Sequence, residues 1–364
     1  MEERRLGSRY VLTERLGRGA MGQVYRARVE PDAVDQGAEP TGEATGVAVK
    51  LLRDDLGADP DLIHRFLQEG RLLKSVDHPN VVRIRDLVAE GDQLAIVMDL
   101  VQDGDLRRAV PMPCPEGQAA QIVAGISAGL AAVHAAGIIH RDLKPENVLI
   151  ERTEDGRARP RIGDFGVSRF DSATTTQTKG MTGTVGYLAP EIAQGRPATP
   201  ASDVYSLGVI LYELCVGHGP FKADHPIALI RAHAQDPVPR PPAMSQPMWE
   251  LVEALLGKEP RGRPTADQAV QRLRRLGLSV SPAQDTIPVG LFLLRPWSEQ
   301  RTPGAARTPA QPVAPATISG DSAAPPTISE SAPVVAAEPM VPTLPAVHAD
   351  PVAPTDPVVT GGSA

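Results

Sequence analysis

The chain has 364 residues, of which 41% are hydrophobic, 22% are charged and 3% are aromatic, and its formal net charge is −7 at pH 7. This length accommodates one large or two ordinary domains, and the acidic balance excludes a strongly basic nucleic-acid-binding surface. The two cysteines, Cys114 and Cys215, stand without a partner motif. That pattern excludes a disulfide scaffold and a cysteine-based zinc site, and it is typical of a reducing cytosol. We therefore expect a cytoplasmic protein that binds no nucleic acid.

Three segments could be mistaken for a signal peptide or a membrane span. Met1–Leu6 begins with charged residues and has no apolar core after it, unlike a secretory signal. Ile122–Ile139 is weakly apolar because it is rich in glycine and alanine, and Val289–Leu294 is too short to cross a bilayer. The sequence thus predicts no signal peptide and no membrane span.

Proline is unevenly distributed along the chain. Residues 1–281 hold 21 prolines, whereas the last 83 residues hold 16 and also lose the hydrophobic periodicity. Such a segment buries too little apolar surface to offset its ordering entropy. We predict a folded domain over residues 8–278 and a disordered tail, rich in Pro, Ala and Thr, over residues 279–364.

Within the folded part, the hydrophobic pattern changes from strands to helices. Strands are predicted at Tyr10–Leu16, Val24–Val29, Val47–Leu52, Ile84–Val88 and Leu94–Met98. One helix among them begins at Asp59-Pro60, an N-cap followed by proline at the first helical position. Later helices are predicted at Gln118–Ala136, Ser202–Cys215, Ile227–Ala234, Met248–Leu256 and Ala266–Leu276. This order indicates an α+β protein with a small antiparallel β-rich lobe (about 8–98), a connection (99–104) and a larger α-helical lobe (105–278).

The glycine motif Gly17-Arg-Gly-Ala-Met-Gly22 admits three interpretations. It could be a flexible turn, a dinucleotide-binding turn, or a loop that folds over phosphate groups. A dinucleotide-binding turn needs a helix after it, whereas Gln23–Val29 alternates as a strand does. The motif therefore favours a phosphate-covering loop between two strands.

A lysine and a glutamate are expected to pair beside this loop. Period-two alternation puts Ala48 and Lys50 on one face of their strand and Val47 and Val49 on the other. Lys50 could instead be a strand lysine that reaches solvent. Glu69 favours the functional reading, because it lies on an apolar helix stripe where a carboxylate is costly unless it is paired.

The most specific segment is His140-Arg-Asp-Leu-Lys-Pro-Glu-Asn147, followed by Asp164-Phe-Gly166. It matches, in order, the catalytic-loop and metal-binding motifs of kinases. Pro145 keeps the segment out of a helix, so its polar groups converge from a loop. The chemistry suits Asp142 as acceptor of a hydroxyl proton, Lys144 as a cation for the moving phosphoryl group, and Asn147 with Asp164 as Mg²⁺ ligands.

On these motifs, residues 8–278 resemble the bacterial eukaryotic-like (Hanks-type) protein Ser/Thr kinases. The resemblance implies the two-lobed protein kinase fold and an enzyme that transfers the γ-phosphoryl group of ATP to protein Ser/Thr hydroxyls in signalling. It implies ATP and Mg²⁺ as cofactors, with Mn²⁺ as an alternative metal. It also implies a nucleotide site in which Met98 is the gatekeeper, while Asp99 and Val101 contact adenine through backbone atoms. The expected ATP-binding residues are Leu16, Gly17, Arg18, Gly19, Ala20, Met21, Gly22, Val24, Ala48, Lys50, Met98, Asp99, Val101 and Leu149.

Further positions follow from the same resemblance. Gly183-Thr184 and Ala189-Pro190-Glu191 match the substrate-docking segment, where Thr184 would bind the catalytic Asp and Lys. Asp203 would brace the catalytic loop, and Arg263 would pair with Glu191. The expected catalytic set is Asp142, Lys144, Lys50, Glu69 and Thr184, with Arg141, Glu191, Asp203 and Arg263 in structural roles.

The resemblance also suggests how activity is controlled. Arg141 would gain a dianionic partner from a phosphothreonine in the loop between Asp164 and Glu191. Thr176 and Thr178 lie where bacterial relatives autophosphorylate. An unregulated polar loop is the alternative reading.

Partners are expected to be protein substrates, a second copy through the small lobe, and phosphothreonine-binding modules that read the tail. Unlike many relatives, the sequence shows no membrane helix or extracellular repeats after the kinase part. Pro-x-x-Pro spacings in the tail permit polyproline docking, although a bare linker is the simpler reading.

Two other functions are alternatives to an active protein kinase. A pseudokinase would bind nucleotide without turnover, but none of the catalytic positions is substituted. A small-molecule phosphotransferase on a related fold would lack the Ala189-Pro190-Glu191 segment. Both patterns favour a protein kinase.

Overall fold

A computed structural model describes residues 4–19, 22–30, 46–52, 60–91, 93–165, 185–276 and 287–288. Contacts divide the chain into a unit of residues 1–304 and a unit of residues 305–364, and only the first contains described residues. The predicted tail therefore lies outside the described residues, apart from Ile287–Pro288, and its disorder and its start at residue 279 stay predictions. The loop threonines Thr176, Thr178 and Thr184 also lie outside them.

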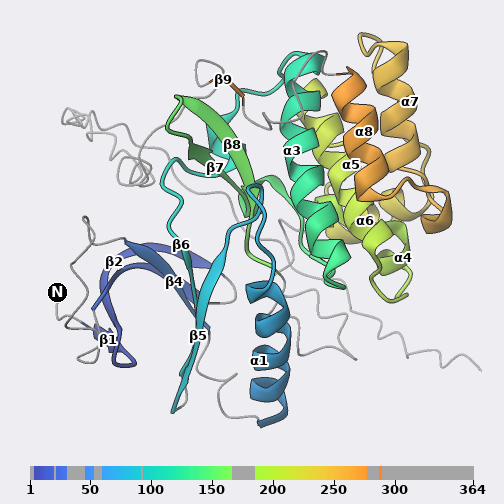
Figure 1. Cartoon of the computed structure of the whole chain (residues 1–364). Helices are drawn as coiled ribbons and strands as arrows, with labels where there is room; N and C mark the ends of the chain where they lie inside the picture. The colour runs from blue at the N-terminus through green and yellow to red at the C-terminus, as the bar shows by residue number, and fades with distance from the viewer. Residues whose placement is uncertain are drawn as a thin grey trace, which may run out of the picture. The chain divides into compact units, whose positions relative to one another are not determined.

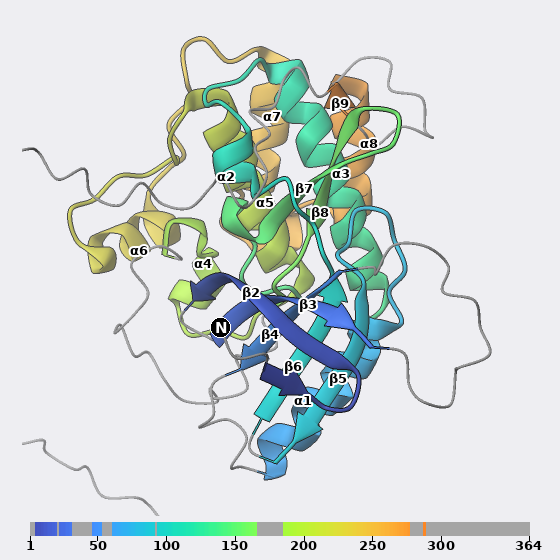
Figure 2. The same cartoon turned by 90° about the vertical axis from the view of Figure 1, so that its left-hand side faces the viewer.

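The first lobe is a curled antiparallel sheet with one helix (Figures 1 and 2). Its strands are β1 (Arg4–Leu6), β2 (Tyr10–Gly19), β3 (Gly22–Val29), β4 (Val47–Leu52), β5 (Ile84–Glu90) and β6 (Gln93–Asp99), and its helix is α1 (Pro60–Lys74). The spatial order is β1-β2-β3-β4-β6-β5, and α1 packs against β5. The predicted antiparallel lobe is confirmed. β1 was not predicted, because three residues carry too little periodicity to recognise.

The second lobe is mainly helical. Its helices are α2 (Leu106–Ala109), α3 (Glu116–Ala135), α4 (Pro190–Ala193), α5 (Pro200–Val216), α6 (Pro226–Gln235), α7 (Gln246–Leu255) and α8 (Ala266–Leu276). A small sheet combines β7 (Val148–Arg152), β8 (Arg157–Ile162) and β9 (Ile287–Pro288) in that order. The five long predicted helices are present with ends shifted by zero to two residues. The four-residue helices α2 and α4 escaped prediction for the same reason as β1.

Alternation along β4 divides the small lobe into two cores. Val47, Val49 and Leu51 pack with Ala95 and Val97 on one face of the sheet. Lys50 faces the other side, where it lines a small pocket together with Ile96 and Met98. The predicted separation of the two strand faces is therefore present. It directs Lys50 toward the helical lobe.

Helix α3 is the centre of the second lobe and owes its position to small residues. It packs against α5, α8 and β8, and most of its side chains are buried. An added Cβ at Gly129 would lie 2.4 Å from the backbone oxygen of Asn80, and one at Gly125 would lie 2.7 Å from Pro160. The loop before β5 can therefore lie directly on the helix, which joins the two lobes by backbone contact.

The apolar character of α3 also matches a membrane span by length and composition. Of the described helices, α3 alone meets that criterion, and 67% of its apolar window is buried inside the structure. The core helix of a globular domain meets the same criterion. The finding is weak evidence for a span.

The close approach at Gly129 predicts the effect of a single methyl group. Gly129→Ala should destabilise the protein by about 1–3 kcal/mol, because the backbone of Asn80 must move to admit a Cβ. Gly117→Ala on the same helix is the matched control, since nothing lies within 4 Å of its added Cβ. There the helix preference of alanine should raise stability by up to about 1 kcal/mol. Chemical denaturation measures both, and equal effects at the two sites would contradict the packing explanation.

Candidate active site

The segment between α3 and β7 places two predicted site residues, Lys144 and Asn147, around the carboxylate of the predicted proton acceptor Asp142. Asp142 Oδ2 accepts from Lys144 Nζ at 2.9 Å and from Asn147 Nδ2 at 3.0 Å. Asn147 Nδ2 also donates to the backbone oxygen of Asp142 at 2.7 Å. Pro145 begins a short 3₁₀ helix (η2, Pro145–Asn147), which turns Asn147 back toward Asp142. The carboxylate is thus oriented by two donors before any substrate binds.

Asp203 of α5 binds the backbone of the same loop. Its carboxylate accepts from the backbone N–H groups of His140 and Arg141, both at 2.8 Å, and lies 2.9 Å from Nε2 of His134. Arg141 has φ of +65°, a conformation unfavourable for a residue with a side chain. The buried carboxylate stabilises that strained loop, so the bracing contact expected of Asp203 is present.

Arg141 is exposed. A phosphothreonine as its anionic partner stays a prediction. The threonines proposed to supply that partner lie outside the described residues.

Lys50 of β4 forms an ion pair with Asp164, the residue two places after β8. Lys50 Nζ lies 2.9 Å from Asp164 Oδ1, and Asp164 has φ of +52°. Desolvation would raise the pKa of Asp164, but the charge and hydrogen bond of Lys50 outweigh it and hold this pKa below its usual range. The carboxylate is therefore ionised at neutral pH. The pair also joins the two lobes.

This pairing differs from the one expected from sequence, which was Lys50 with Glu69. Two carboxylates compete for one ammonium group, and the one that follows β8 reaches it in this structure. Glu69 lies on α1 and is half-buried, so its charge needs less compensation than a fully buried carboxylate would.

His140 connects the catalytic loop to the segment that carries Asp164, a role the sequence analysis missed. The fully buried ring lies with Nε2 2.9 Å from the backbone oxygen of Gly163, and its centroid is 5.0 Å from that of Phe165. Its place directly before Arg141 and Asp142 was the available signal. These two contacts hold the catalytic loop against the segment that follows β8.

Asn147 and Asp164 offer oxygen atoms suited to a hard divalent cation. Because Nδ2 of Asn147 donates to Asp142, its Oδ1 points away, and none of the described residues donates to it. Asp164 adds an ionised carboxylate that is 42% exposed. Mg²⁺ is usually held by one or two such ligands together with phosphate oxygens. The donor set fits the metal expected from sequence.

The predicted nucleotide-binding residues lie on neighbouring strands. The register places Gly17 opposite Val24, Val24 opposite Lys50, and Ala48 opposite Met98. Gly19 pairs with Gly22, so a strand follows the glycine turn, which rules out the dinucleotide-binding alternative. Most of the remaining residues of the set occupy the same strands or nearby segments: Leu16, Arg18, Asp99, Val101 and Leu149. Ala20 and Met21 lie outside the described residues.

Gly22 is required for the packing of two neighbouring strands. An added Cβ would lie 1.9 Å from the backbone oxygen of Leu51, and the residue has φ of +144°. The third glycine of the motif thus lets β3 approach β4 closely.

Asp99 is held by two arginines where the lobes meet. It accepts from Arg85 Nε at 2.7 Å and from Arg161 Nη2 at 2.8 Å. Arg161 of β8 also binds Glu151 and the backbone oxygen of Val81. Arg161 was not predicted from the sequence, because a buried arginine in a strand has no local signature. It links the connection between the lobes to the strand that leads to Asp164.

Glu191 and Arg263 form the buried pair expected from sequence. The guanidinium donates to both carboxylate oxygens at 2.8 Å, and Ser202 Oγ donates to one of them at 2.7 Å. The side chains of Arg263 and Glu191 are 0% and 2% exposed. Desolvation would raise the pKa of Glu191, but these hydrogen bonds outweigh it and keep this pKa below the usual range.

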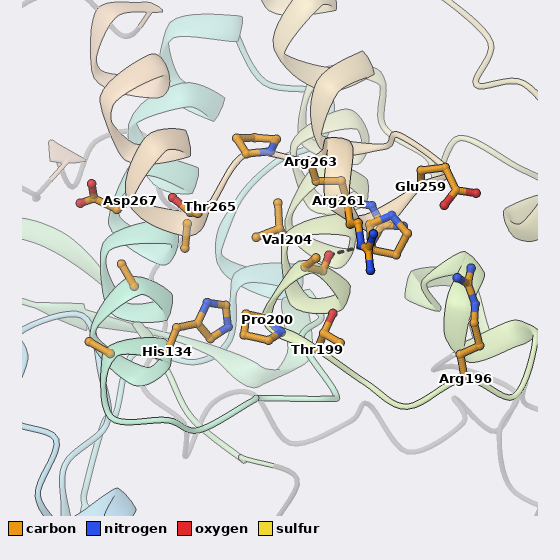
Figure 3. A pocket seen from close by; sticks show the side chains of 16 residues that line it. His134, Arg196, Thr199, Pro200, Val204, Glu259, Arg261, Arg263, Thr265 and Asp267 are labelled. Carbon is orange, nitrogen blue, oxygen red and sulfur yellow. Dashed lines mark hydrogen bonds between the residues drawn. The ribbon is translucent and has the colours of Figure 1, made fainter. Parts of the chain in front are cut away.

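A pocket lies beside the supporting contacts of Asp203 and Glu191. It has a volume of about 890 Å³, and both His134 and Arg263 line it (Figure 3). None of its lining residues belongs to the predicted ATP-binding set. By contrast, the described cavity beside Lys50 and Met98 measures about 20 Å³.

Comparison with known sequences gives consistent results. The protein kinase domain family matches residues 10–273. Serine/threonine-protein kinase PkaA of Streptomyces coelicolor is 41% identical over 290 residues, which cover 79% of this chain and 53% of that protein. PkaB of the same organism is 42% identical over 281 residues, covering 75% of this chain and 64% of that protein.

A mycobacterial protein matches over a similar range. Serine/threonine-protein kinase PknA of Mycobacterium tuberculosis is 36% identical over 307 residues, which cover 78% of this chain and 65% of that protein. The chain therefore spans between about half and two thirds of the length of these three relatives.

The buried pair predicts a stability loss that depends on pH. Glu191→Gln should destabilise the protein by about 3–5 kcal/mol at neutral pH, because Arg263 keeps its charge without a counter-ion. The pKa of Glu191 is lower in the folded protein than its ordinary value of 4.5. The ionised wild-type carboxylate therefore stabilises the fold fully at pH values above 4.5, and this contribution is lost as the pH falls through the folded-state pKa. The gap between wild type and variant should therefore shrink in acid.

Urea unfolding at several pH values measures that gap. Glu253→Gln on α7 is the control, since Glu253 is exposed and its substitution should change stability by no more than about 0.5 kcal/mol. A loss at Glu191 no larger than at Glu253 would show that Arg263 needs no carboxylate partner.

Proposed function

Because the chain belongs to the protein kinase family, we propose that it transfers the γ-phosphoryl group of ATP to serine and threonine hydroxyls of proteins. One observation carries this proposal: the oriented carboxylate of Asp142, held by Lys144 and Asn147. The Lys50–Asp164 pair supports it from the other lobe.

Each group suits one part of the transfer. Asp142 can accept the proton of the acceptor hydroxyl through its carboxylate, which Lys144 and Asn147 hold in one orientation. The hydroxyl oxygen then bonds to the γ-phosphorus as the bond to the β,γ-bridging oxygen breaks and ADP leaves. Lys144 and Lys50 carry the positive charge that opposes the negative charge of the phosphates. The intact motif set and this charge arrangement favour turnover over nucleotide binding alone.

Mg²⁺, with Mn²⁺ as an alternative, is the proposed metal. When bound, it would neutralise phosphate charge and orient the phosphate oxygens. Asn147 would hold it through Oδ1 and Asp164 through its carboxylate. Lys50 and Glu69 complete the proposed machinery, and Thr184 would contact the catalytic loop from the substrate side.

Several finer proposals accompany this function. The catalytic domain would comprise residues 8–278, act in the cytoplasm and dimerise through the small lobe. Its tail would recruit phosphothreonine-binding modules once phosphorylated. Phosphorylation of Thr176 or Thr178 would provide an anionic partner for Arg141.

Autophosphorylation tests the proposal directly. Purified protein incubated with Mg-ATP should incorporate phosphate at Thr176 or Thr178, as mapped by mass spectrometry. Asp142→Asn should lower the rate by about 10²–10⁴-fold because the proton acceptor is removed. The separate variant Lys50→Met should also lose most of the phosphate transfer, because it lacks the cation that opposes the phosphate charge. Arg152→Ala, an exposed change on β7, is the control and should leave the rate unchanged.

Three outcomes would contradict parts of the proposal. ATP binding without phosphate transfer would favour a pseudokinase. Transfer to a small metabolite but not to protein would favour the small-molecule alternative. Equal rates in wild type and Asp142→Asn would remove Asp142 from its assigned role.

A further inference from the structure

Lys258 of the helical lobe is held differently from the lysines of the candidate active site. Lys50 and Lys144 each form an ion pair with an aspartate. Lys258 follows α7 in the chain, and its Nζ donates instead to the backbone oxygen of His233 at 2.8 Å. Its ammonium group is therefore held by a neutral acceptor, and no carboxylate of the described residues lies within ion-pair distance of it.

Two aromatic rings lie close to this ammonium group. Nζ of Lys258 is 4.6 Å from the centre of the Phe221 ring and 6.0 Å from the centre of the Tyr205 ring. The lysine is half-buried, so the rings replace part of the water that would solvate its charge. Loss of that water favours the neutral amine over the ammonium ion.

A second cation lies beside the lysine. Arg263 Nη2 donates to the backbone oxygen of Lys258 at 3.1 Å, and its guanidinium lies 5.0 Å from the centre of the Tyr205 ring. Desolvation is the largest influence on the pKa of Lys258. Together with repulsion from Arg263, it outweighs the attraction of exposed Asp236 and lowers this pKa to about 8. A lysine that is desolvated and next to another cation is an activated nucleophile.

The other titratable groups around Lys258 do not supply a compensating charge. Desolvation lowers the pKa of His233 on α6 to about 4, and desolvation raises the pKa of Tyr205 on α5, so both are neutral near pH 7. Glu191 of α4 is ionised but is bound by a guanidinium. Glu259, the next residue, is exposed. With a pKa of about 8, about a quarter of Lys258 is neutral amine at pH 7.5, against about one part in a thousand for a lysine at the ordinary value.

The same ammonium group stabilises the C-terminal end of α6. Its Nζ lies 2.8 Å from the backbone oxygen of His233 and 3.5 Å from that of Ala232, both in the last turn of the helix. A cation is favourable at that end of a helix. Helix α6 packs in turn against α4 and the 3₁₀ helix η3 (Val185–Tyr187). Loss of the lysine charge would therefore loosen a helix that supports the Ala189-Pro190-Glu191 segment.

We propose that Lys258 is an acylation site, at which a small acyl phosphate transfers its acyl group to Nζ and thereby frees the C-terminal end of α6. The neutral amine attacks the carbonyl carbon of the donor and forms a C–N bond. The bond from that carbon to the phosphate oxygen breaks, inorganic phosphate leaves, and the proton of the amine passes to water. The product amide keeps one N–H group but has lost the charge. The reaction does not depend on the proposed kinase activity.

Acetyl phosphate is the probe for the first test. The full-length protein is incubated with it between pH 7 and pH 10, and acetylation of each lysine is followed by mass spectrometry. At pH 7.5, Lys258 should react at least about tenfold faster than Lys222, which is exposed and serves as the matched control. The rate at Lys258 should reach half its maximum near pH 8 and then level off, because the amine is then fully neutral. A rate at Lys258 no greater than at Lys222 would overturn the proposal.

Hydrogen exchange of the α6 amides tests the consequence. Acetylation of the wild-type protein should speed exchange in the last turn of α6 by about threefold or more, and Lys258→Gln should do the same because it also removes the charge. Lys258→Arg keeps the charge, so exchange should stay slow even after treatment with acetyl phosphate. Lys222→Gln is the control and should leave α6 unchanged.

Each remaining outcome decides one part of the proposal. Unchanged exchange in wild-type protein acetylated at Lys258 would overturn the release of α6, even if Lys258→Gln proved too unstable to measure. Faster exchange in treated Lys258→Arg would place the responsible modification elsewhere and overturn the assignment. Neither measurement uses phosphoryl transfer, so a protein without kinase activity would overturn the proposed function and leave this inference standing.

Discussion

The buried carboxylate of Asp203 is the interaction on which the candidate site depends. It accepts two backbone N–H groups from a loop whose Arg141 has a left-handed conformation, and it also binds His134 of α3. Without an acceptor, these N–H groups would be left without a protein partner and the strained turn would lose its support. Because Asp203 lies in the first turn of the core helix α5, the loop inherits the rigidity of the helical lobe. The geometry of the candidate site is thus set by a residue outside the proposed catalytic set.

The two lobes share an apolar core and are also joined by polar contacts. Lys50 reaches Asp164, and Arg161 reaches Asp99, so each lobe contributes a charge to the other. The absence of Cβ atoms at Gly125 and Gly129 allows the loop before β5 to lie on α3. Charged groups in this region are therefore held near fixed backbone, which would limit the reorganisation required by the proposed transfer of a phosphoryl group.

The sequence predicted those features that local pattern determines and missed those that depend on tertiary contact. Alternation along Val47–Leu52 and the helical stripes gave the lobes, and the motif around Asp142 gave the loop. The choice of Asp164 over Glu69 as partner of Lys50 could not be predicted, because it depends on which carboxylate the fold brings nearer. Arg161 could not be predicted for the same reason, since its partners Glu151, Val81 and Asp99 lie 10 or more residues away along the chain.

The hairpin of β7 and β8 has a consequence for how this protein tolerates change. Asn147 immediately precedes one strand and Asp164 follows the other by two residues, while Val148 pairs with Ile162 at the base of the hairpin. The separation of the two residues is therefore set by the base of the ladder and is independent of the length of the turn. Insertions of any size at residues 153–156 would lengthen the far end alone. The site is insulated from such variation, which makes this turn a natural place for evolution, or an experimenter, to add sequence.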